Sequence, residues 1–353
     1  MLKMVRVISV LGHFGFGKEL LNGQTVKTKV VTKELENQLG KEEVYKIDTC
    51  GGKKELPKLF FKSICALKKS KNVVILPAHN GLRFFVPVLN FFNKFYKRKL
   101  FYIVIGGWLA DYLKDKKGLE KKLKKFNGIF VETSTMKKAL EEKGFTNVFV
   151  MPNCKELGIL TKDEMVYPKA EPYKLCTFSR VCKQKGIEDA VNAVIEVNNH
   201  FGRTVYSLDI YGQVDVNETE WFENLKKTFP EYVRYGGLVP FDKSVEVIKD
   251  YFALLFPTLF YTEGIPGTII DAFAAGVPII SSKWLNYNDI LDDSTCLGYD
   301  FGDNNCLKEI LLDEKLSEKI LSFKENCLKK AQDYLPSKVV GGFIRNIEGY
   351  DIA

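Results

Sequence analysis

Residues 256–282, FPTLFYTEGIPGTIIDAFAAGVPIISS, indicate the fold class of this chain most directly. The apolar run at 251–257 predicts a buried parallel strand, and residues 268–275 predict a helix. The tight loop between them contains Gly264, Pro266 and Gly267. Glycine in such a loop lets a ligand approach the backbone closely. A buried strand, a glycine loop and a helix in this order are typical of a doubly wound α/β domain, whose ligands bind at the carboxyl ends of the strands.

Two carboxylates lie on either side of this loop. Glu263 precedes it, and Asp271 follows eight residues later inside the predicted helix. The free amides and the dipole at the helix start, near Thr268, favour a diphosphate by about 0.3 to 1 kcal/mol per exposed anion. Glu263 is placed to meet a sugar hydroxyl, and Asp271 is placed to accept hydrogen bonds from a ribose. We therefore predict a nucleotide-sugar site. Its donor-binding residues would be Gly264, Pro266, Gly267, Thr268 and Asp271. A strand, turn and buried helix without a ligand is the alternative.

A second motif lies at 175–194, LCTFSRVCKQKGIEDAVNAV. It predicts a strand, a loop that carries Arg180 and Lys185, and an amphipathic helix that begins near Gly186. A departing nucleoside diphosphate develops negative charge, which fixed Arg and Lys donors stabilise without reorganising. We assign both cations to that role. The alternative, that both are solvated surface cations, is the ordinary one in a lysine-rich chain.

Together these motifs resemble those of the retaining glycosyltransferases with the GT-B fold. Glu263 matches the first acid of their E-x7-E signature, and Asp271 stands in place of the second. Arg180 and Lys185 match a GR-x4-KG pattern, in which Ser179 replaces the usual glycine. The shorter Asp271 side chain makes the ribose contact less secure than the sugar contact of Glu263.

The resemblance implies transfer of a hexosyl unit from a nucleoside-diphosphate sugar with retention of configuration and without an enzyme nucleophile. It also implies a role in bacterial capsule, exopolysaccharide or O-antigen synthesis. Two other functions stay open. One is a GT-B-fold sugar-nucleotide-binding protein without transferase activity, and the other is a different GT-B reaction such as epimerisation.

The two halves of the chain predict similar architectures. Short apolar runs in the first half lie at 5–11, 72–77, 99–105, 128–133 and 147–151, and the second half has further strand signals at 206–212 and 233–240. A chain of 353 residues is long for one hydrophobic core. We predict an α/β protein with two Rossmann-like doubly wound domains that face a cleft. The acceptor domain would span 1–165 and the nucleotide-sugar domain 166–336, and a final helix in 337–353 would cross back to the first domain.

Three residues of the first half are further site candidates. The loop GHFGFG at 12–17 follows the first predicted strand, and its resemblance to the family's first loop implies donor contacts by Gly15 and Gly17. His79 lies just past another strand end. The resemblance implies contact of this histidine with the sugar or the acceptor, and we include it among the catalytic residues. The alternatives are an ordinary strand-to-helix turn and a structural histidine.

Charge divides unequally between the halves. Residues 1–165 contain 32 Lys and Arg against 16 Asp and Glu, whereas residues 166–353 contain 20 against 28. Lysines alternate with aromatic residues at 91–102, FFNKFYKRKLFY, and are dense at 116–126, KKGLEKKLKKF. Such a face suits an anionic membrane surface and a lipid-linked saccharide acceptor. A solvated lysine-rich helix is the alternative. No helix-turn-helix, zinc or RNA-binding motif supports a nucleic acid partner.

Other classes of protein are disfavoured by what the sequence does not contain. No apolar run approaches the roughly 20 residues that span a bilayer, and the first residues lack a signal-peptide core. We expect a cytoplasmic protein, in peripheral contact with the inner face of the membrane. The eight cysteines have no C-x2-C spacing and should be reduced. There is no Asp-x-Asp cluster or His/Cys set of metal-ligand spacing, so we expect neither a required metal nor a cofactor.

Overall fold

The computed structural model of the 353-residue chain describes residues 5–17, 23–168 and 170–348. The chain divides into two compact units, 1–156 with 334–353, and 157–333. The sequence analysis predicted the boundaries between the units at 165/166 and 336/337, whereas the structure has them at 156/157 and 333/334. Residues 157–165 belong to the second unit because they pack there: Leu160 donates its backbone N–H to the carbonyl of Ala274, and Met165 contacts Gly276.

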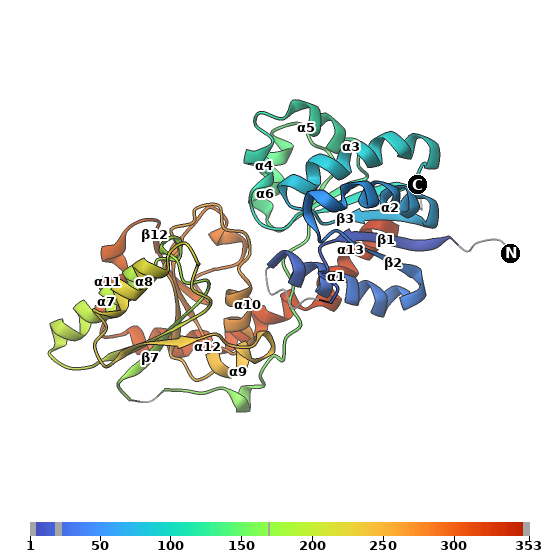
Figure 1. Ribbon diagram of the computed structural model, residues 1–353. Helices are drawn as coiled ribbons and strands as arrows, with labels where there is room; N and C mark the ends of the chain where they lie inside the picture. Colours follow the sequence, from blue (N-terminus) through green and yellow to red (C-terminus); the bar gives the residue numbers. More distant parts are fainter. Residues whose placement is uncertain (1–4, 18–22, 169, 349–353) are drawn as a thin grey trace. The chain divides into compact units, whose positions relative to one another are not determined.

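The first unit contains a parallel sheet of six strands in the order β2-β1-β3-β4-β5-β6 (Figure 1). The strands are β1 (Arg6–Gly12), β2 (Val44–Asp48), β3 (Ser70–Ile75), β4 (Lys99–Ile103), β5 (Gly128–Val131) and β6 (Val148–Val150). Strand order reverses beside β1, whose neighbours are β2 and β3. Ligands of doubly wound sheets bind at such a reversal. The predicted Rossmann-like architecture of the first half is confirmed.

Helices cover both faces of this sheet. Along β3, Val73 and Ile75 face one layer, and Val74 faces the other, as the period of two in a strand requires. The first layer contains α2 (Leu56–Lys69), α3 (His79–Tyr96), α4 (Leu109–Tyr112), α5 (Lys117–Leu123) and α6 (Ser134–Glu141). The second contains α1 (Gly23–Leu39) and the final helix α13 (Pro336–Glu348), drawn in red beside the blue α1 in Figure 1.

Helix α13 completes the core of the first unit although it ends the described chain. Val340 and Phe343 are buried in the layer that α1 also covers, and the Phe343 ring lies 4.7 Å from that of Phe130 on β5. The sequence analysis expected such a returning helix at 337–353. Residues 349–353 of that range lie outside the described residues.

The second unit also contains a six-stranded parallel sheet, in the order β12-β11-β10-β7-β8-β9. Its strands are β7 (Tyr173–Phe178), β8 (Tyr206–Tyr211), β9 (Val233–Gly237), β10 (Ala253–Phe256), β11 (Ile279–Lys283) and β12 (Cys296–Asp300). Its helices are α7 (Ile187–Phe201), α8 (Thr219–Lys226), α9 (Ser244–Ile248), α10 (Gly267–Ala274), α11 (Asn304–Leu312) and α12 (Leu316–Ala331). Helices α7, α8 and α11 share the core on one face, and α10 packs against α12. The second Rossmann-like unit is therefore also confirmed.

Two simple observations complete the fold. None of the helices in the described ranges is long and apolar enough to cross a membrane. All eight cysteines lie in the described part of the chain and are free thiols.

Candidate functional site

The two sequence motifs of the second unit meet in an ion pair. Lys185 ends a short 3-10 helix (Lys183–Lys185) after β7, and Glu263 lies in the loop after β10. Because β7 and β10 are parallel neighbours, their carboxyl ends bring the two loops together. The Lys185 Nζ donates a short, charge-assisted hydrogen bond to the Glu263 Oε2, and both side chains are less than one-fifth exposed. The structure thus joins two predicted site residues that lie 78 positions apart in the chain.

Backbone contacts between the same loops fix this pair. Gly186 has a φ of +66° and lies against the carbonyl of Pro257, so closely that any Cβ would collide with it. Leu259 donates its backbone N–H to the carbonyl of Gln184 at 2.9 Å. The glycine after Lys185 is therefore required both for its left-handed backbone and for the close approach of the two loops.

Asn286 supports the Glu263 segment from a third strand connection. It follows β11, and its Nδ2 donates to the backbone carbonyl of Glu263 at 2.6 Å. The Asn286 side chain is buried. Sequence reasoning did not single out Asn286, because an asparagine in a loop has no motif that separates a positioning residue from a turn residue.

Helix α10 begins where the loop after Glu263 ends. The helix starts at Gly267, directly after Pro266, and contains no acidic residue in its first turn. The Thr268 Oγ1 is buried and has no hydrogen-bond partner among the described residues. Asp271 is buried one turn further on. The start of α10 is thus a set of backbone donors with no side-chain cap, an arrangement suited to an anion.

Arg180 is paired with a different carboxylate from the one that Lys185 contacts. Its side chain is 65% exposed, and the Nη1 lies 3.6 Å from the Asp215 Oδ2. This pairing follows from the bridge between Val181 and Val214, which sets the 179–181 and 212–215 segments side by side. The structure therefore assembles Lys185 with Glu263 and leaves Arg180 on the surface with a different carboxylate.

In the first unit, Asp48 organises the glycine loop that follows β1. The Oδ1 accepts the backbone N–H groups of Phe14 and Gly15 at 3.0 and 3.2 Å, and the Oδ2 accepts that of Phe16 at 2.9 Å. Burial acts to raise the pKa of Asp48, but these amides and that of Cys50 lower it below the usual value. The N–H of Gly15 is thus already bonded, whereas Gly17 contributes a positive φ of 77°. Sequence reasoning missed Asp48 because it lies at the end of β2, which was not predicted.

His79 is at the start of α3, and its imidazole stacks on the first unit's tryptophan. Its ring centroid lies 3.8 Å from that of Trp108 and 4.8 Å from that of Tyr112. Burial and the charge of Lys116 lower the pKa of His79 below its ordinary value. The protonated form of His79 is therefore disfavoured. The neutral imidazole can donate one hydrogen bond and accept another.

A cavity of about 660 Å³ lies beside His79 in the first unit. It is lined by His13, Gln24, Thr49, Gly51, Leu56, Leu59, Pro77, Ala78, His79, Asn80, Gly81, Arg83, Phe84 and Phe85. The His13 Nδ1 is hydrogen-bonded to the Thr25 Oγ1 at 2.8 Å. A mostly apolar hollow with a few convergent polar groups is the usual form of a small-ligand site.

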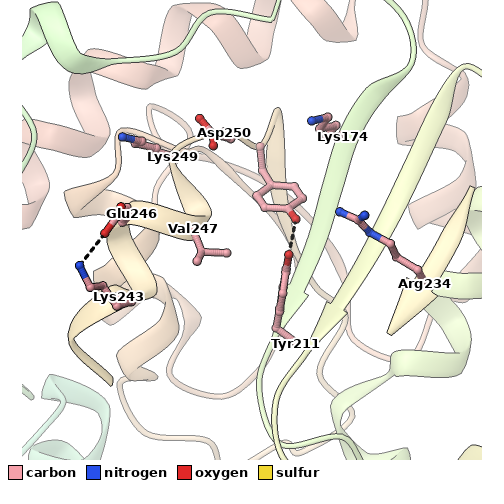
Figure 2. A pocket seen from close by; sticks show the side chains of 9 residues that line it. Lys174, Tyr211, Arg234, Lys243, Glu246, Val247, Lys249 and Asp250 are labelled. Carbon is pink, nitrogen blue, oxygen red and sulfur yellow. Dashed lines mark hydrogen bonds and ion pairs between the residues drawn. The ribbon is translucent and has the colours of Figure 1, made fainter. Parts of the chain in front are cut away.

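Figure 2 shows a different hollow, of about 580 Å³, in the second unit. It is lined by Lys174, Tyr211, Arg234, Lys243, Glu246, Val247, Lys249, Asp250 and Tyr251. Arg234 and Tyr251 both donate to the buried Asp209, so a satisfied polar network forms one side of the hollow. Of these described lining residues, none belongs to the two sequence motifs. We therefore separate this hollow from the Lys185–Glu263 site.

A metal site does not emerge from the described ranges. No group of three or more His, Cys, Asp or Glu side chains among them is arranged to hold an ion.

Comparison with known proteins gives this geometry a family context. Residues 172–321 match the family model "Glycosyl transferases group 1". The matched segment contains Arg180, Lys185, Glu263 and Asp271. The match covers less than half of the chain and lies within the second unit, which is thus similar to that family. A search of curated protein sequences finds no match.

Solved structures share the architecture over nearly the whole chain. HepE from Anabaena, solved with UDP and glucose, has a TM-score of 0.71 at 12% identity and covers 98% of this chain and 100% of its own. The lipopolysaccharide outer core galactosyltransferase WaaB, in its apo form, has a TM-score of 0.72 at 17% identity, with 97% and 99% covered. Sucrose-phosphate synthase from Thermosynechococcus elongatus gives 0.72 at 14% identity, with 98% and 100% covered. At these identities the likeness establishes the GT-B fold.

Proposed function

We propose that this chain transfers a hexosyl unit from a nucleoside-diphosphate sugar to a glycan acceptor, with retention of anomeric configuration. The observation that carries the proposal is the Lys185–Glu263 pair, which the loops after β7 and β10 hold beside each other. The resemblance to the family implies that Lys185 contacts the donor diphosphate and that Glu263 contacts the donor sugar. Their juxtaposition supports one donor site.

The donor diphosphate would be held by Lys185 and by the start of α10. An ammonium carries three hydrogens, so Lys185 retains donors for phosphate while it is oriented by Glu263. The uncapped amides after Pro266 supply further donors. Arg180 would turn from Asp215 to the diphosphate, since its exposed side chain has room to change rotamer. The loop residues Gly264 and Gly267 would leave space for the phosphates.

Glu263 would accept hydrogen bonds from hydroxyls of the transferred sugar, and Asp271 from the ribose. In the proposed step, the bond from the anomeric carbon to the diphosphate oxygen breaks. The acceptor oxygen forms its bond on the same face, and the acceptor proton passes to the departing diphosphate. Fixed cations stabilise the charge that develops on the leaving group. No side chain of the protein forms a covalent bond with the sugar, and no metal or cofactor takes part.

The acceptor would bind to the first unit. The cavity beside His79 offers apolar walls and polar groups that suit part of a saccharide, and His79 itself would contact the reacting sugar or the acceptor hydroxyl. Gly15 and Gly17 would take part in donor binding, as the resemblance to the family implies. We propose a lipid-linked acceptor, a site of action at the cytoplasmic face of a membrane, and a role in bacterial surface polysaccharide synthesis. WaaB, which shares the fold, is named for an outer-core lipopolysaccharide reaction.

Ligand-induced stabilisation tests the donor site first. The purified chain would be heated with UDP, GDP, dTDP, ADP and CMP, beginning with UDP because HepE was solved with it. A ligand at about 100 times its Kd stabilises the folded state by about 2.7 kcal/mol. We expect one nucleotide to raise the Tm of the wild type and to have a smaller effect on Lys185→Ala. If none raises it, the donor site is refuted.

Product analysis tests the reaction. The nucleotide sugar that stabilises the chain most would be incubated with candidate saccharide acceptors, and proton NMR would report the anomeric configuration of the product. A retained configuration is expected. An inverted product would contradict the mechanism, and conversion of the donor to another sugar nucleotide without an acceptor would indicate an epimerase.

A further inference from the structure

Helices α2 and α3 of the first unit are neighbours (Figure 1), and both expose phenylalanine side chains. Phe61 on α2 is 66% exposed, and Phe91 and Phe95 on α3 are 55% and 74% exposed. Single exposed apolar residues are common on protein surfaces, but large contiguous ones mark interaction sites. The question is whether these three rings form one surface.

Ring contacts connect them. Phe61 packs edge-on against Phe60 at 5.6 Å between centroids, and Phe60 contacts Phe92 across the two helices at 5.4 Å. Phe92 then contacts Phe91 at 5.1 Å, and Phe91 contacts Phe95 at 6.4 Å. We call these five phenylalanines the aromatic surface. It is continuous from α2 to α3.

The charges around the aromatic surface are predominantly positive. Residues 56–110 contain ten Lys and Arg and no Asp or Glu. Several of these cations are exposed on α2 or α3, among them Lys68, Lys94 and Lys58, of which Lys58 is paired with Glu55 at 3.3 Å. The Lys94 Nζ lies 5.8 Å from the centre of the Phe91 ring. An apolar patch bordered by lysines that greatly outnumber the carboxylates has the composition of a surface that rests on anionic lipid.

A basic hollow borders the same helix. It has a volume of about 180 Å³ and is lined by Arg83, Pro87, Lys116, Leu119 and Lys122. Helix α5 closes it, since the Asn90 Nδ2 on α3 donates to the carbonyl of Lys122 at 3.2 Å. Pro87, Phe91 and Phe95 follow one another at intervals of four, so they lie along one side of α3. The hollow and the exposed rings therefore belong to one side of the unit.

We propose that the aromatic surface docks onto an anionic phospholipid bilayer. Phe61, Phe91 and Phe95 enter the boundary between headgroups and acyl chains, and the hollow of Arg83, Lys116 and Lys122 receives a lipid phosphate. A second copy of the chain fits less well, because two such surfaces would bring their lysines together with too few carboxylates to pair them. Nucleic acid fits less well because exposed phenylalanines gain most from hydrocarbon. The inference deepens the proposed function, since it supplies the membrane that a lipid-linked acceptor requires.

Vesicle sedimentation measures this docking on the full chain. One set of vesicles contains phosphatidylcholine alone, and in the other about a third of the lipid is phosphatidylglycerol. We expect binding to the anionic vesicles and at least tenfold weaker binding to the neutral ones. Binding should also weaken as the salt concentration is raised, because salt screens the attraction between the lysines and the anionic headgroups.

Matched variants locate the contact. Phe61→Ser/Phe91→Ser/Phe95→Ser should weaken binding to anionic vesicles by about tenfold or more, since it removes the inserted rings. Val216→Ser/Leu238→Ser removes two exposed apolar side chains from the second unit and should leave binding unchanged. Lys122→Gln, at the hollow, should weaken binding by about fivefold, and Lys315→Gln, exposed in the second unit, should not.

The outcomes separate membrane docking from donor chemistry. Stabilisation by the nucleotide should be the same for the triple phenylalanine variant and the wild type, which shows that the variant folds and that its donor site is intact. Absence of binding to anionic vesicles would overturn the docking inference even if the nucleotide binds. Unchanged lipid binding by the triple variant would also overturn it. So would duplex RNA that binds the chain more tightly and displaces the vesicles. A third contrary result would be a triple variant that loses a dimer, measured by light scattering, and keeps its lipid binding.

Discussion

The two units of this protein share an architecture and differ in what lies at the ends of their strands. Each has six parallel strands. In the second unit, two loops are joined by the Lys185–Glu263 ion pair and by backbone contacts. In the first, Asp48 holds a glycine loop through backbone amides, and the same unit has a cavity beside His79 and the aromatic surface on α2 and α3. A chemical site fixed by charged side chains is thus paired with a unit that offers shape and charge.

One buried lysine from each unit gives a second comparison. Lys27 on α1 forms a 2.5 Å ion pair with Glu132, and the Nζ also donates to the carbonyl of Val104. Lys324 on α12 is fully buried, and its Nζ has no hydrogen-bond partner among the described residues. Lys27 therefore has an ion pair and a hydrogen bond, whereas the Nζ of Lys324 has the Tyr167 ring at 5.8 Å and no hydrogen-bond partner among the described residues. Their replacements should change stability in opposite directions.

Lys27→Met should have the largest effect. It removes the cation beside the buried Glu132 carboxylate and should lower the free energy of unfolding by about 3 to 5 kcal/mol. Urea denaturation measures this value. Lys29→Met, at an exposed position on the same helix, is the control and should change little. A loss no larger than that of the control would mean that the pair contributes nothing to the first unit.

Lys324→Met should stabilise the protein. Burial lowers the pKa of Lys324 from 10.5 to about 8, so the folded state is penalised while the lysine is protonated. This penalty, about 3 kcal/mol, is present in full below pH 8 and is relieved as pH rises toward 10.5. Methionine should therefore raise the free energy of unfolding at pH 7 by up to that amount, and the gain over wild type should shrink by pH 9.5. A gain that is constant with pH would contradict the role of protonation, and Lys329→Met is the exposed control.

Glu263→Ala tests whether the second unit holds the chemistry. Turnover of the nucleotide sugar should fall by about a hundredfold or more, because sugar hydroxyls lose their partner in the transition state. Steady-state kinetics with saturating donor measure this. Glu231→Ala, at an exposed position of the same unit, should retain wild-type turnover. Near-normal turnover in Glu263→Ala would remove this residue from the site.

Arg180→Ala should have the smallest effect. Its side chain is exposed and paired with Asp215, so it would contribute only after it turns to the diphosphate. We expect binding of UDP to weaken by about tenfold and binding of uridine to stay unchanged, as measured by calorimetry. Arg203→Ala, exposed elsewhere in the second unit, is the matched control. Equal losses for UDP and uridine would rule out a phosphate contact.

Sequence reasoning succeeded where a segment is buried on both faces. Strands β3, β4, β5 and β10 consist largely of apolar residues, and each was predicted within a few positions of its observed range. Three strands were not predicted: β2 and β12, each at one edge of its sheet, and β11 (Ile279–Lys283), in which polar residues follow only two isoleucines. In β2 and β12, VYKID and CLGYD, only the first and fourth residues are buried and polar groups are present, so these strands give no continuous apolar run.

The sequence by itself determined the residue types of the candidate site and their order along the chain. A glycine turn, a helix start and charged residues at fixed spacing depend on local backbone geometry, so Lys185, Glu263 and α10 could be predicted from the amino-acid sequence. Only the tertiary structure decided which of these residues meet. Lys185 bonds to Glu263 because β7 and β10 are neighbours, Arg180 turns to Asp215 because of the Val181–Val214 bridge, and Asp48 reaches the glycine loop because β2 pairs with β1. Contacts between residues far apart in the chain follow from strand order, which no local pattern encodes.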